Sequence, residues 1–231
     1  MVYNINYFMF VPMMMKLHMN LKKSLGLIFF LMSISSFAQS DIDSLEIRVS
    51  QLDSAKDEKT WSNLFHAFEN LSSERPAEWL PVYYEGYSVL QLGMFQKESR
   101  MKDEYYDQAT RFAALADSLN PHNAEILILR CYAACMKITV DPYNRGQKFG
   151  ILSRAYLDSA MQISPDNPRA LYLRGVSDMY TPIEYGGGKK IALPTLEAAV
   201  NKFSTEKPIS PVAPHWGADL AMKMLEECRK K

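Results

Sequence analysis

The feature that most constrains the fold of this chain is a helical spacing of apolar residues from about residue 41 to the C-terminus. Apolar residues recur every three or four positions, and no long alternation of β-branched residues occurs. The spacing predicts an all-α protein built from consecutive amphipathic helices. The expected helices cover residues 41–55, 58–71, 77–93, 103–120, 124–137, 151–164, 169–180, 189–203 and 213–231.

Two of these segments share a common frame, which indicates an internal repeat. In both, an alanine lies five positions before a proline, a polar turn follows, and a new helix then begins. The pairs that this frame makes equivalent are Ala116 and Ala160, Pro121 and Pro165, Leu127 and Leu171, and Cys131 and Gly175. The last pair matches two small residues, which is typical of a place where two helices approach closely.

The residue types in this frame resemble the tetratricopeptide repeat (TPR). Small residues stand where paired helices touch, a proline closes the second helix, and a bulky residue comes early in the next one. The resemblance covers about residues 77–227 and is carried by Ala109, Ala116, Pro121, Ala160, Pro165, Leu171, Gly175 and Ala199. It implies a TPR-like solenoid of helical pairs. The two helices within 41–71 are either an N-terminal cap or a decayed repeat.

The repeat is longer than the family standard. Pro121 and Pro165 are 44 positions apart, whereas a TPR unit has about 34 residues. The excess falls inside each unit, at 93–104, 139–150 and 180–190. We therefore expect three long intra-repeat loops. Because equivalent loops of a solenoid emerge on the same edge, they would line one rim and form a binding surface.

One of these stretches, TPIEYGGGKK at 181–190, invites comparison with a phosphate-binding loop. It lacks the preceding strand, the spaced first glycine and the Ser or Thr after the lysine that such a loop needs. Its glycines Gly186, Gly187 and Gly188 are better explained as a turn into the next helix. Lys189 and Lys190 could still attract an anion at the helix start. The loop also resembles loops in exported bacterial TPR-like proteins, including the T component of TRAP transporters.

The first helix of each TPR unit lines the concave surface, so the resemblance implies a groove lined by the aromatic residues of those helices. The residues placed there are Tyr84, Tyr87, Tyr132, Arg169, Tyr172 and Tyr180. Tyrosines with one arginine suit a peptide, or an organic ligand that carries a carboxylate. The alternative is that these tyrosines fill the core between helices.

No catalytic or metal-binding motif is present in the sequence. Cys131 and Cys135 share a helix face, but a zinc site normally has four ligands in tight pairs, so helix packing explains Cys131 better. The histidines of the mature chain, His66, His122 and His215, belong to no HExxH motif and neighbour no nucleophile. We therefore predict no enzyme activity, no cofactor and no metal.

The sequence of the N-terminal region indicates that the protein is exported. Lys22 and Lys23 precede an apolar run, residues 25–38, that is shorter than the ~20 residues of a membrane span and ends in a small-x-small pattern. We expect a signal peptide over 1–38, with Met19 as a second candidate start, no membrane span after processing, and one TPR-like domain over 39–231 in the periplasm or outside the cell.

The expected function is non-enzymatic. The first hypothesis is a scaffold that binds an envelope protein or peptide through its groove and rim. The second is a small-ligand-binding protein associated with a transporter, with an organic anion as ligand. The formal net charge is zero, so no basic surface predicts a nucleic-acid partner.

Overall fold

The computed structural model describes residues 44–230, and over this range it contains helices and turns without strands. The predicted all-α class is confirmed. No helix within 44–230 is both long enough and apolar enough to cross a membrane. The predicted signal peptide, 1–38, and the candidate start at Met19 lie outside the described residues.

The helices follow one another with short connections. A helical stretch over 44–50 and a 3₁₀ turn, η1 (Leu52–Ser54), come first. The following helices are α2 (Glu58–Glu74), α3 (Trp79–Phe95), α4 (Ser99–Leu119), α5 (Ala124–Val140), α6 (Pro142–Ile163), α7 (Pro168–Tyr180), α8 (Lys189–Thr205) and α9 (Ala218–Arg229), with η2 (Ile183–Tyr185) between α7 and α8.

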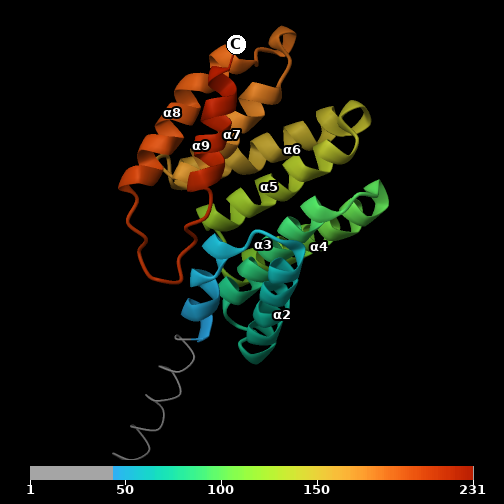
Figure 1. Ribbon diagram of the computed structural model, residues 1–231, viewed down its shortest axis with the longest axis vertical. Coiled ribbons are helices and arrows are strands. Elements are labelled where there is room, and N and C mark those ends of the chain that lie inside the picture. Colours follow the sequence, from blue (N-terminus) through green and yellow to red (C-terminus); the bar gives the residue numbers. More distant parts are fainter. Residues whose placement is uncertain (1–43, 231) are drawn as a thin grey trace, which may run out of the picture. The chain divides into compact units, whose positions relative to one another are not determined.

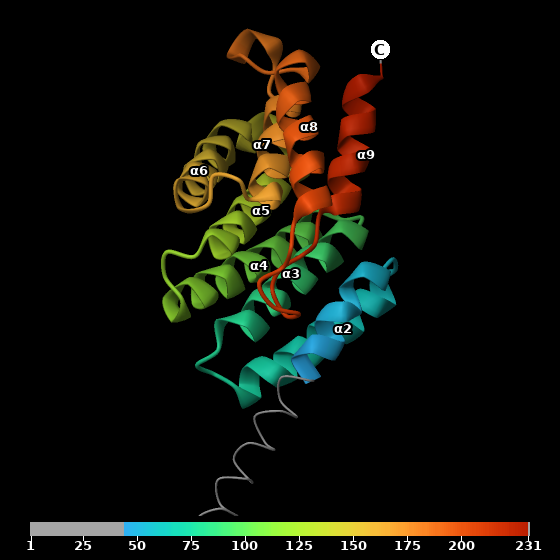
Figure 2. The ribbon, with the colours of Figure 1, turned by 90° about the vertical axis from the view of Figure 1, so that its left-hand side faces the viewer.

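The helices stack in two layers (Figures 1 and 2). Helix α3 packs on α4, α5 on α6, and α7 on α8, so these are the helical pairs of the repeat. The first helices of successive pairs also contact one another, α3 with α5 and α5 with α7, and α7 contacts α9. These helices form the inner layer, and α4, α6 and α8 cover its outer side. The arrangement confirms the predicted α-helical solenoid.

Small residues lie at the contacts between paired helices. The alanines of the TPR frame, Ala109, Ala116, Ala160 and Ala199, have no exposed surface. At Gly175, a Cβ atom would lie 2.6 Å from the Leu196 side chain of α8. Only a residue without a Cβ lets α7 and α8 approach this closely, because real Cβ contacts do not fall below about 3 Å.

The structure differs from the expectation of long loops inside the repeats. Helix α5 continues to Val140 and α6 begins at Pro142, so only Asp141 separates them. The Asp141 side chain accepts a hydrogen bond from the Asn144 backbone N–H, and Pro142 occupies the first turn, where its missing N–H costs nothing. Most of the extra residues in 93–104 are likewise helical. The pairs α3–α4 and α5–α6 are thus lengthened at one end, which Figure 1 shows as projecting tips.

The third stretch, between α7 and α8, is a loop. Gly186 and Gly188 have φ angles of 84° and 101°, which favour glycine. Gly187 lies so close to the backbone of α7 that a Cβ atom would be 2.2 Å from the Thr181 carbonyl oxygen. The Gly188 N–H donates to the carbonyl of Asp178 at 2.8 Å. All three glycines therefore fit a tight reversal into α8.

The last expected helix is shorter than predicted. This helix was expected to begin at residue 213, but α9 begins at Ala218. The twelve residues 206–217 between α8 and α9 have no helix or strand, and we call them the α8–α9 segment. In Figures 1 and 2 this segment leaves the C-terminal helices and extends toward α3.

Candidate ligand site on the inner helices

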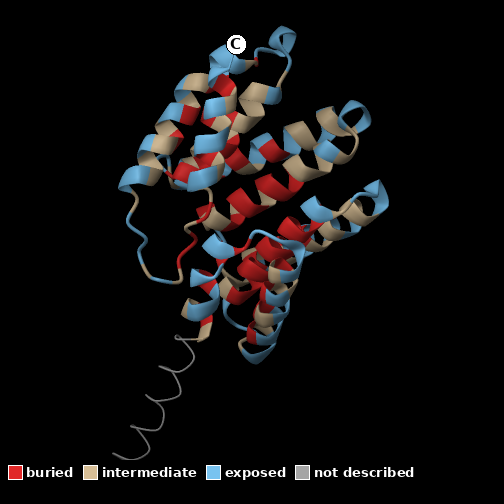
Figure 3. Cartoon of the chain, viewed as in Figure 1, coloured by how far each residue is buried: buried red, intermediate tan, exposed pale blue. Residues whose placement is uncertain are grey.

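The candidate site is built on α3, the most deeply buried helix. Every residue from Pro81 to Gly93 is buried, and Figure 3 shows the buried positions gathered on α3 and α5. A helix that is buried on all sides needs other elements to cover each of its faces. Helix α3 supplies Tyr83, Tyr84 and Tyr87 to the inner layer, α5 supplies Tyr132 and α7 supplies Tyr172; each is at most 6% exposed.

Trp216 of the α8–α9 segment covers part of these tyrosines. Its indole ring stacks on Tyr87, with ring centroids 5.0 Å apart and an angle of 20° between the planes. It also stacks on Tyr132, at 5.5 Å and 26°. Its Nε1–H donates to the Tyr83 hydroxyl at 2.8 Å. We call the position against the Tyr87 and Tyr132 rings, which Trp216 occupies, the aromatic slot; Trp216 is 5% exposed there.

Two further contacts hold the segment to the N-terminal part of the chain. The Tyr84 hydroxyl donates to the Val212 carbonyl oxygen at 2.9 Å. His215 Nε2 lies 3.5 Å from a carboxylate oxygen of Asp53. The inner surface thus holds an extended stretch of its own chain through an aromatic side chain and a main-chain carbonyl.

Arg169, which we expected to meet a ligand carboxylate, is bound by carboxylates of the protein. Its guanidinium donates to both oxygens of Glu125 at 2.8 Å, and to the two oxygens of Glu206 at 2.7 and 3.0 Å. Burial lowers the Arg169 pKa, but attraction and hydrogen bonds from Glu125 and Glu206 outweigh it, so the pKa is raised overall. Arg169 therefore fastens the start of the α8–α9 segment to α5.

The tyrosines of the cluster remain protonated at neutral pH. Burial raises the pKa of Tyr83, Tyr87 and Tyr132 well above the ordinary value, because the phenolate would lose its hydration. Burial likewise raises the pKa of Tyr84. These hydroxyls therefore act as neutral donors and acceptors.

One buried polar nitrogen at the slot makes no hydrogen bond of good geometry among the described residues. Gln91, one turn after Tyr87 on α3, is 9% exposed, and its Nε2 has no hydrogen-bond partner within 44–230. Gln91 lies close enough to the Tyr132 hydroxyl to influence the pKa of that tyrosine. A buried amide nitrogen without an acceptor costs folding free energy, so such groups usually need an explanation.

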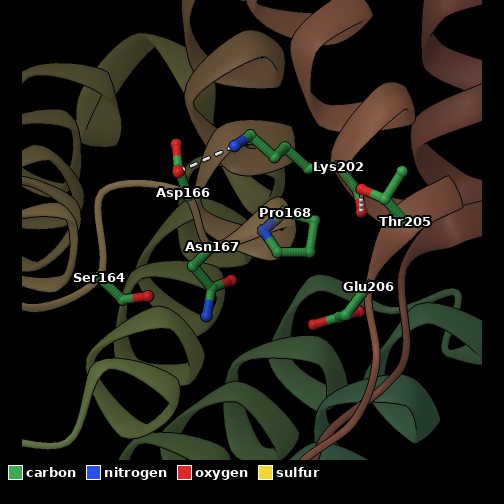
Figure 4. A pocket seen from close by; sticks show the side chains of 7 residues that line it. All are labelled: Ser164, Asp166, Asn167, Pro168, Lys202, Thr205 and Glu206. Carbon is green, nitrogen blue, oxygen red and sulfur yellow. Dashed lines mark hydrogen bonds and ion pairs between the residues drawn. The ribbon is translucent and has the colours of Figure 1, made fainter.

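A shallow pocket of about 300 Å³ opens on the outside of the Arg169 cluster (Figure 4). It lies between the α6–α7 turn and the end of α8, and Lys202 pairs there with Asp166 at 2.8 Å. Its lining is Ser164, Asp166, Asn167, Pro168, Lys202, Thr205 and Glu206. The lining is polar and carries no aromatic ring, so the pocket offers little to a flat apolar ligand.

The remaining predicted site residues lie away from the aromatic slot. Tyr180 is 68% exposed near the end of α7. Lys189 and Lys190 are exposed at the start of α8, and Lys189 Nζ donates to the Lys230 carbonyl oxygen at 2.9 Å. The structure therefore does not bring the two lysines to the tyrosine cluster.

The residues that we predicted to have structural roles can also be located in the fold. Cys131 is fully buried in α5, where a hydrogen bond with Cys135 and burial raise the pKa of its thiol. Pro121 and Pro165 are exposed in the turns that follow α4 and α6. Over residues 44–230 no three His, Cys, Asp or Glu side chains are grouped to hold a metal ion.

Sequence reasoning missed Tyr83, Gln91 and Trp216. A signal for Trp216 was present, because Pro208, Pro211 and Pro214 recur every third residue in PISPVAPHWG. Prolines at that spacing prevent a helix. The expected helix from residue 213 ignored them, and so placed Trp216 on a helix instead of in a segment able to reach α3.

Comparisons with known proteins give a relative of the whole domain. No family profile and no curated protein sequence matches the chain. A thermophilic TPR protein from Thermus thermophilus is 15% identical and has a TM-score of 0.55, over 81% of this chain and 86% of that chain. At that identity the likeness shows the fold alone. It confirms the TPR-like architecture, whereas nothing in the comparisons supports the likeness to TRAP transporters.

The second relative is closer. The HusA haemophore from Porphyromonas gingivalis has a TM-score of 0.73 and 30% sequence identity, over 81% of this chain and 92% of that chain. Identity at this level across nearly the whole length of a solved chain, with the same order of helices in space, shows that this protein belongs to the same family as the HusA haemophore.

Proposed function

We propose that this protein is an exported, non-enzymatic carrier that binds a flat tetrapyrrole of the haem class on its inner helices. The observation that carries the proposal is the 30% identity over 92% of a haemophore chain. The second of the two functional hypotheses from the sequence, a small-ligand-binding protein, is therefore favoured over the first.

The chemistry of the inner face suits such a ligand. A porphyrin is a large, flat and mostly apolar ring, and aromatic side chains stack on such rings favourably. Tyr87 and Tyr132 both already stack on a flat ring, that of Trp216, in the aromatic slot. Tyrosine oxygen is also one of the ligands that haem iron accepts in proteins, and the inner helices carry the buried tyrosines named above.

The protein-binding scaffold remains the second candidate, because one observation favours it. The inner surface holds the extended α8–α9 segment through the Val212 carbonyl and the Trp216 side chain. A partner peptide with an aromatic residue could be bound by the same contacts. Copurification of a stoichiometric protein whose binding requires Tyr84 would favour this candidate.

The test is a titration of the mature protein with hemin and with iron-free protoporphyrin, followed by visible absorbance. We expect saturable binding of both, with weaker binding to Tyr87→Ala and Tyr132→Ala. Tyr143→Ala is the matched control, since Tyr143 is 96% exposed and distant in sequence from the slot residues of α3. Absence of saturable binding to the wild type and to every variant would refute the carrier function.

Export is tested separately. If the signal peptide is removed after Ala38, the secreted or periplasmic protein begins at Gln39. Mass measurement of the native protein checks this, and a full-length chain recovered from membranes would contradict it.

A further inference from the structure

The α8–α9 segment is much longer than its place in the repeat requires. The equivalent connections, α4 to α5 and α6 to α7, use four residues each, 120–123 and 164–167. The connection from α8 to α9 uses twelve, 206–217. Residues 207–211 are mostly exposed, but Val212 and Trp216 contact α3, more than 120 positions earlier in the chain.

The segment contacts the inner surface as a bound ligand would. Trp216 stacks on the rings of Tyr87 and Tyr132, its N–H donates to the Tyr83 hydroxyl, and the Val212 carbonyl accepts from the Tyr84 hydroxyl. Before these contacts, residues 207–211 have no helix or strand and are mostly exposed, with Ile209 98% exposed. The segment is therefore held to the domain at separate points, and it has no hydrophobic core of its own.

The slot also contains a polar group, the Gln91 amide, to which the segment makes no hydrogen bond. The Gln91 amide is buried beside the Tyr132 hydroxyl, with which it interacts, but its nitrogen makes no hydrogen bond of good geometry within 44–230. A donor kept at the edge of an aromatic site, at a cost to stability, is what a ligand with an acceptor atom would satisfy.

We propose that the aromatic slot is the binding site for a flat aromatic ring, that Trp216 is its internal occupant, and that the ligand displaces it. The inference rests on the proposed carrier function and deepens it, because it assigns the ligand position and a competing segment of the same chain.

The two ends of the segment allow such an exchange. Glu206 is held by the Arg169 guanidinium through two hydrogen bonds. Gly217 has a φ angle of 112°, and a Cβ there would lie 2.9 Å from the Phe203 ring, so this end is fixed by backbone geometry. Residues 207–216 can leave the slot while both ends stay in place.

The consequence is a lowered apparent affinity. When the binding-competent form is only a fraction of the population, the measured Kd rises by the inverse of that fraction. A change that weakens the hold on the segment without altering the slot should therefore tighten ligand binding.

The decisive variant is Tyr84→Phe, which removes only the hydroxyl that holds the Val212 carbonyl. We expect hemin and protoporphyrin to bind it about two- to tenfold more tightly than the wild type. Trp216→Ala should tighten binding further, and Tyr143→Phe, at an exposed tyrosine, should change nothing. In wild type, adding protoporphyrin should speed amide hydrogen exchange across 207–216, because those residues leave the slot.

The outcomes separate the two proposals. If hemin binds wild type but Tyr84→Phe leaves Kd unchanged or weaker, or residues 207–216 become more protected, displacement is wrong and the carrier function stands. If only Tyr84→Phe or Trp216→Ala binds, the segment closes the slot fully and the inference is supported. If no form binds either ring, the carrier function and the inference both fail. Should Trp216→Ala not fold, Tyr84→Phe and hydrogen exchange still decide.

Discussion

The α6–α7 turn and the α8–α9 segment occupy equivalent places in the repeat, yet they are held in opposite ways. The turn, 164–167, is stabilised mainly by contacts close in sequence: the Asn167 side chain accepts from the backbone N–H groups of Arg169 and Ala170. The segment, 206–217, has few local hydrogen bonds and depends on tyrosines of α3.

This difference indicates which part of the chain serves architecture and which serves binding. A four-residue turn capped by Asn167 connects successive repeats, and the same side chain links it to Glu125 of the preceding repeat. The equivalent connection between α8 and α9 has twelve residues, and two of them, Val212 and Trp216, contact the tyrosines of α3. Long connections of this kind are commonly functional.

Trp216→Ala is expected to have the largest effect on stability. The ring is buried between two tyrosines, and loss of a buried aromatic side chain costs about 3–5 kcal/mol. Urea denaturation measures the change. A loss below about 1 kcal/mol would show that the contacts of the segment contribute little to stability. The contrast between the segment and the α6–α7 turn would then be wrong.

Asn167→Ala is expected to come next, with Asn123→Ala as the matched control. Both asparagines cap the first helix of a repeat, and loss of such a cap costs about 1 kcal/mol. Asn167 also donates to Glu125 at 2.6 Å, so its loss should cost about 1 kcal/mol more. Equal losses in the two variants would mean that this link between repeats contributes nothing measurable.

Tyr84→Phe should have a smaller effect on stability than either. It removes one hydrogen bond to a main-chain carbonyl, which corresponds to about 0.5–1.5 kcal/mol, and it keeps the stacking on Phe68 at 5.1 Å. Thermal unfolding of the ligand-free protein measures it. A loss as large as that of Trp216→Ala would indicate that the Tyr84 hydroxyl also supports the core of α3.

Ile209→Ser should have the smallest effect. Its side chain is 98% exposed at the tip of the segment, so the free energy of unfolding should change by less than about 0.5 kcal/mol. The same denaturation experiment checks it. A clear destabilisation would show that the tip is packed, contrary to the contrast drawn between the two connections.

The fold could be predicted from the sequence because its determinants are local. Helical periodicity, the prolines after α4 and α6, and the small residues Cys131 and Gly175 at equivalent positions are all visible within one repeat. The greater length of α6 could also have been predicted, because Asp141 followed by Pro142 is typical of a helix start. We interpreted those residues as a loop because the standard repeat length was taken as a limit on the helices.

The candidate site could be predicted only in part. The TPR frame placed Tyr84, Tyr87, Tyr132 and Tyr172 on the inner helices, and the structure has them there. Whether they were open to a ligand or covered depended on a segment about 130 positions away, which no periodicity encodes. The role of Arg169 was missed for the same reason, because Glu206 reaches it only after α8 has folded back.

The α8–α9 segment also bears on how the chain unfolds. Each unit of a repeat protein contacts only its neighbours, so such arrays can fray from their ends. Here the last pair is tied to α3 by Trp216 and Val212, across contacts that skip whole repeats. Opening the C-terminal pair must then break contacts near the N-terminal one. The domain should therefore unfold as one cooperative unit, and its long-range closure should make it fold more slowly than an untied helical array of the same length.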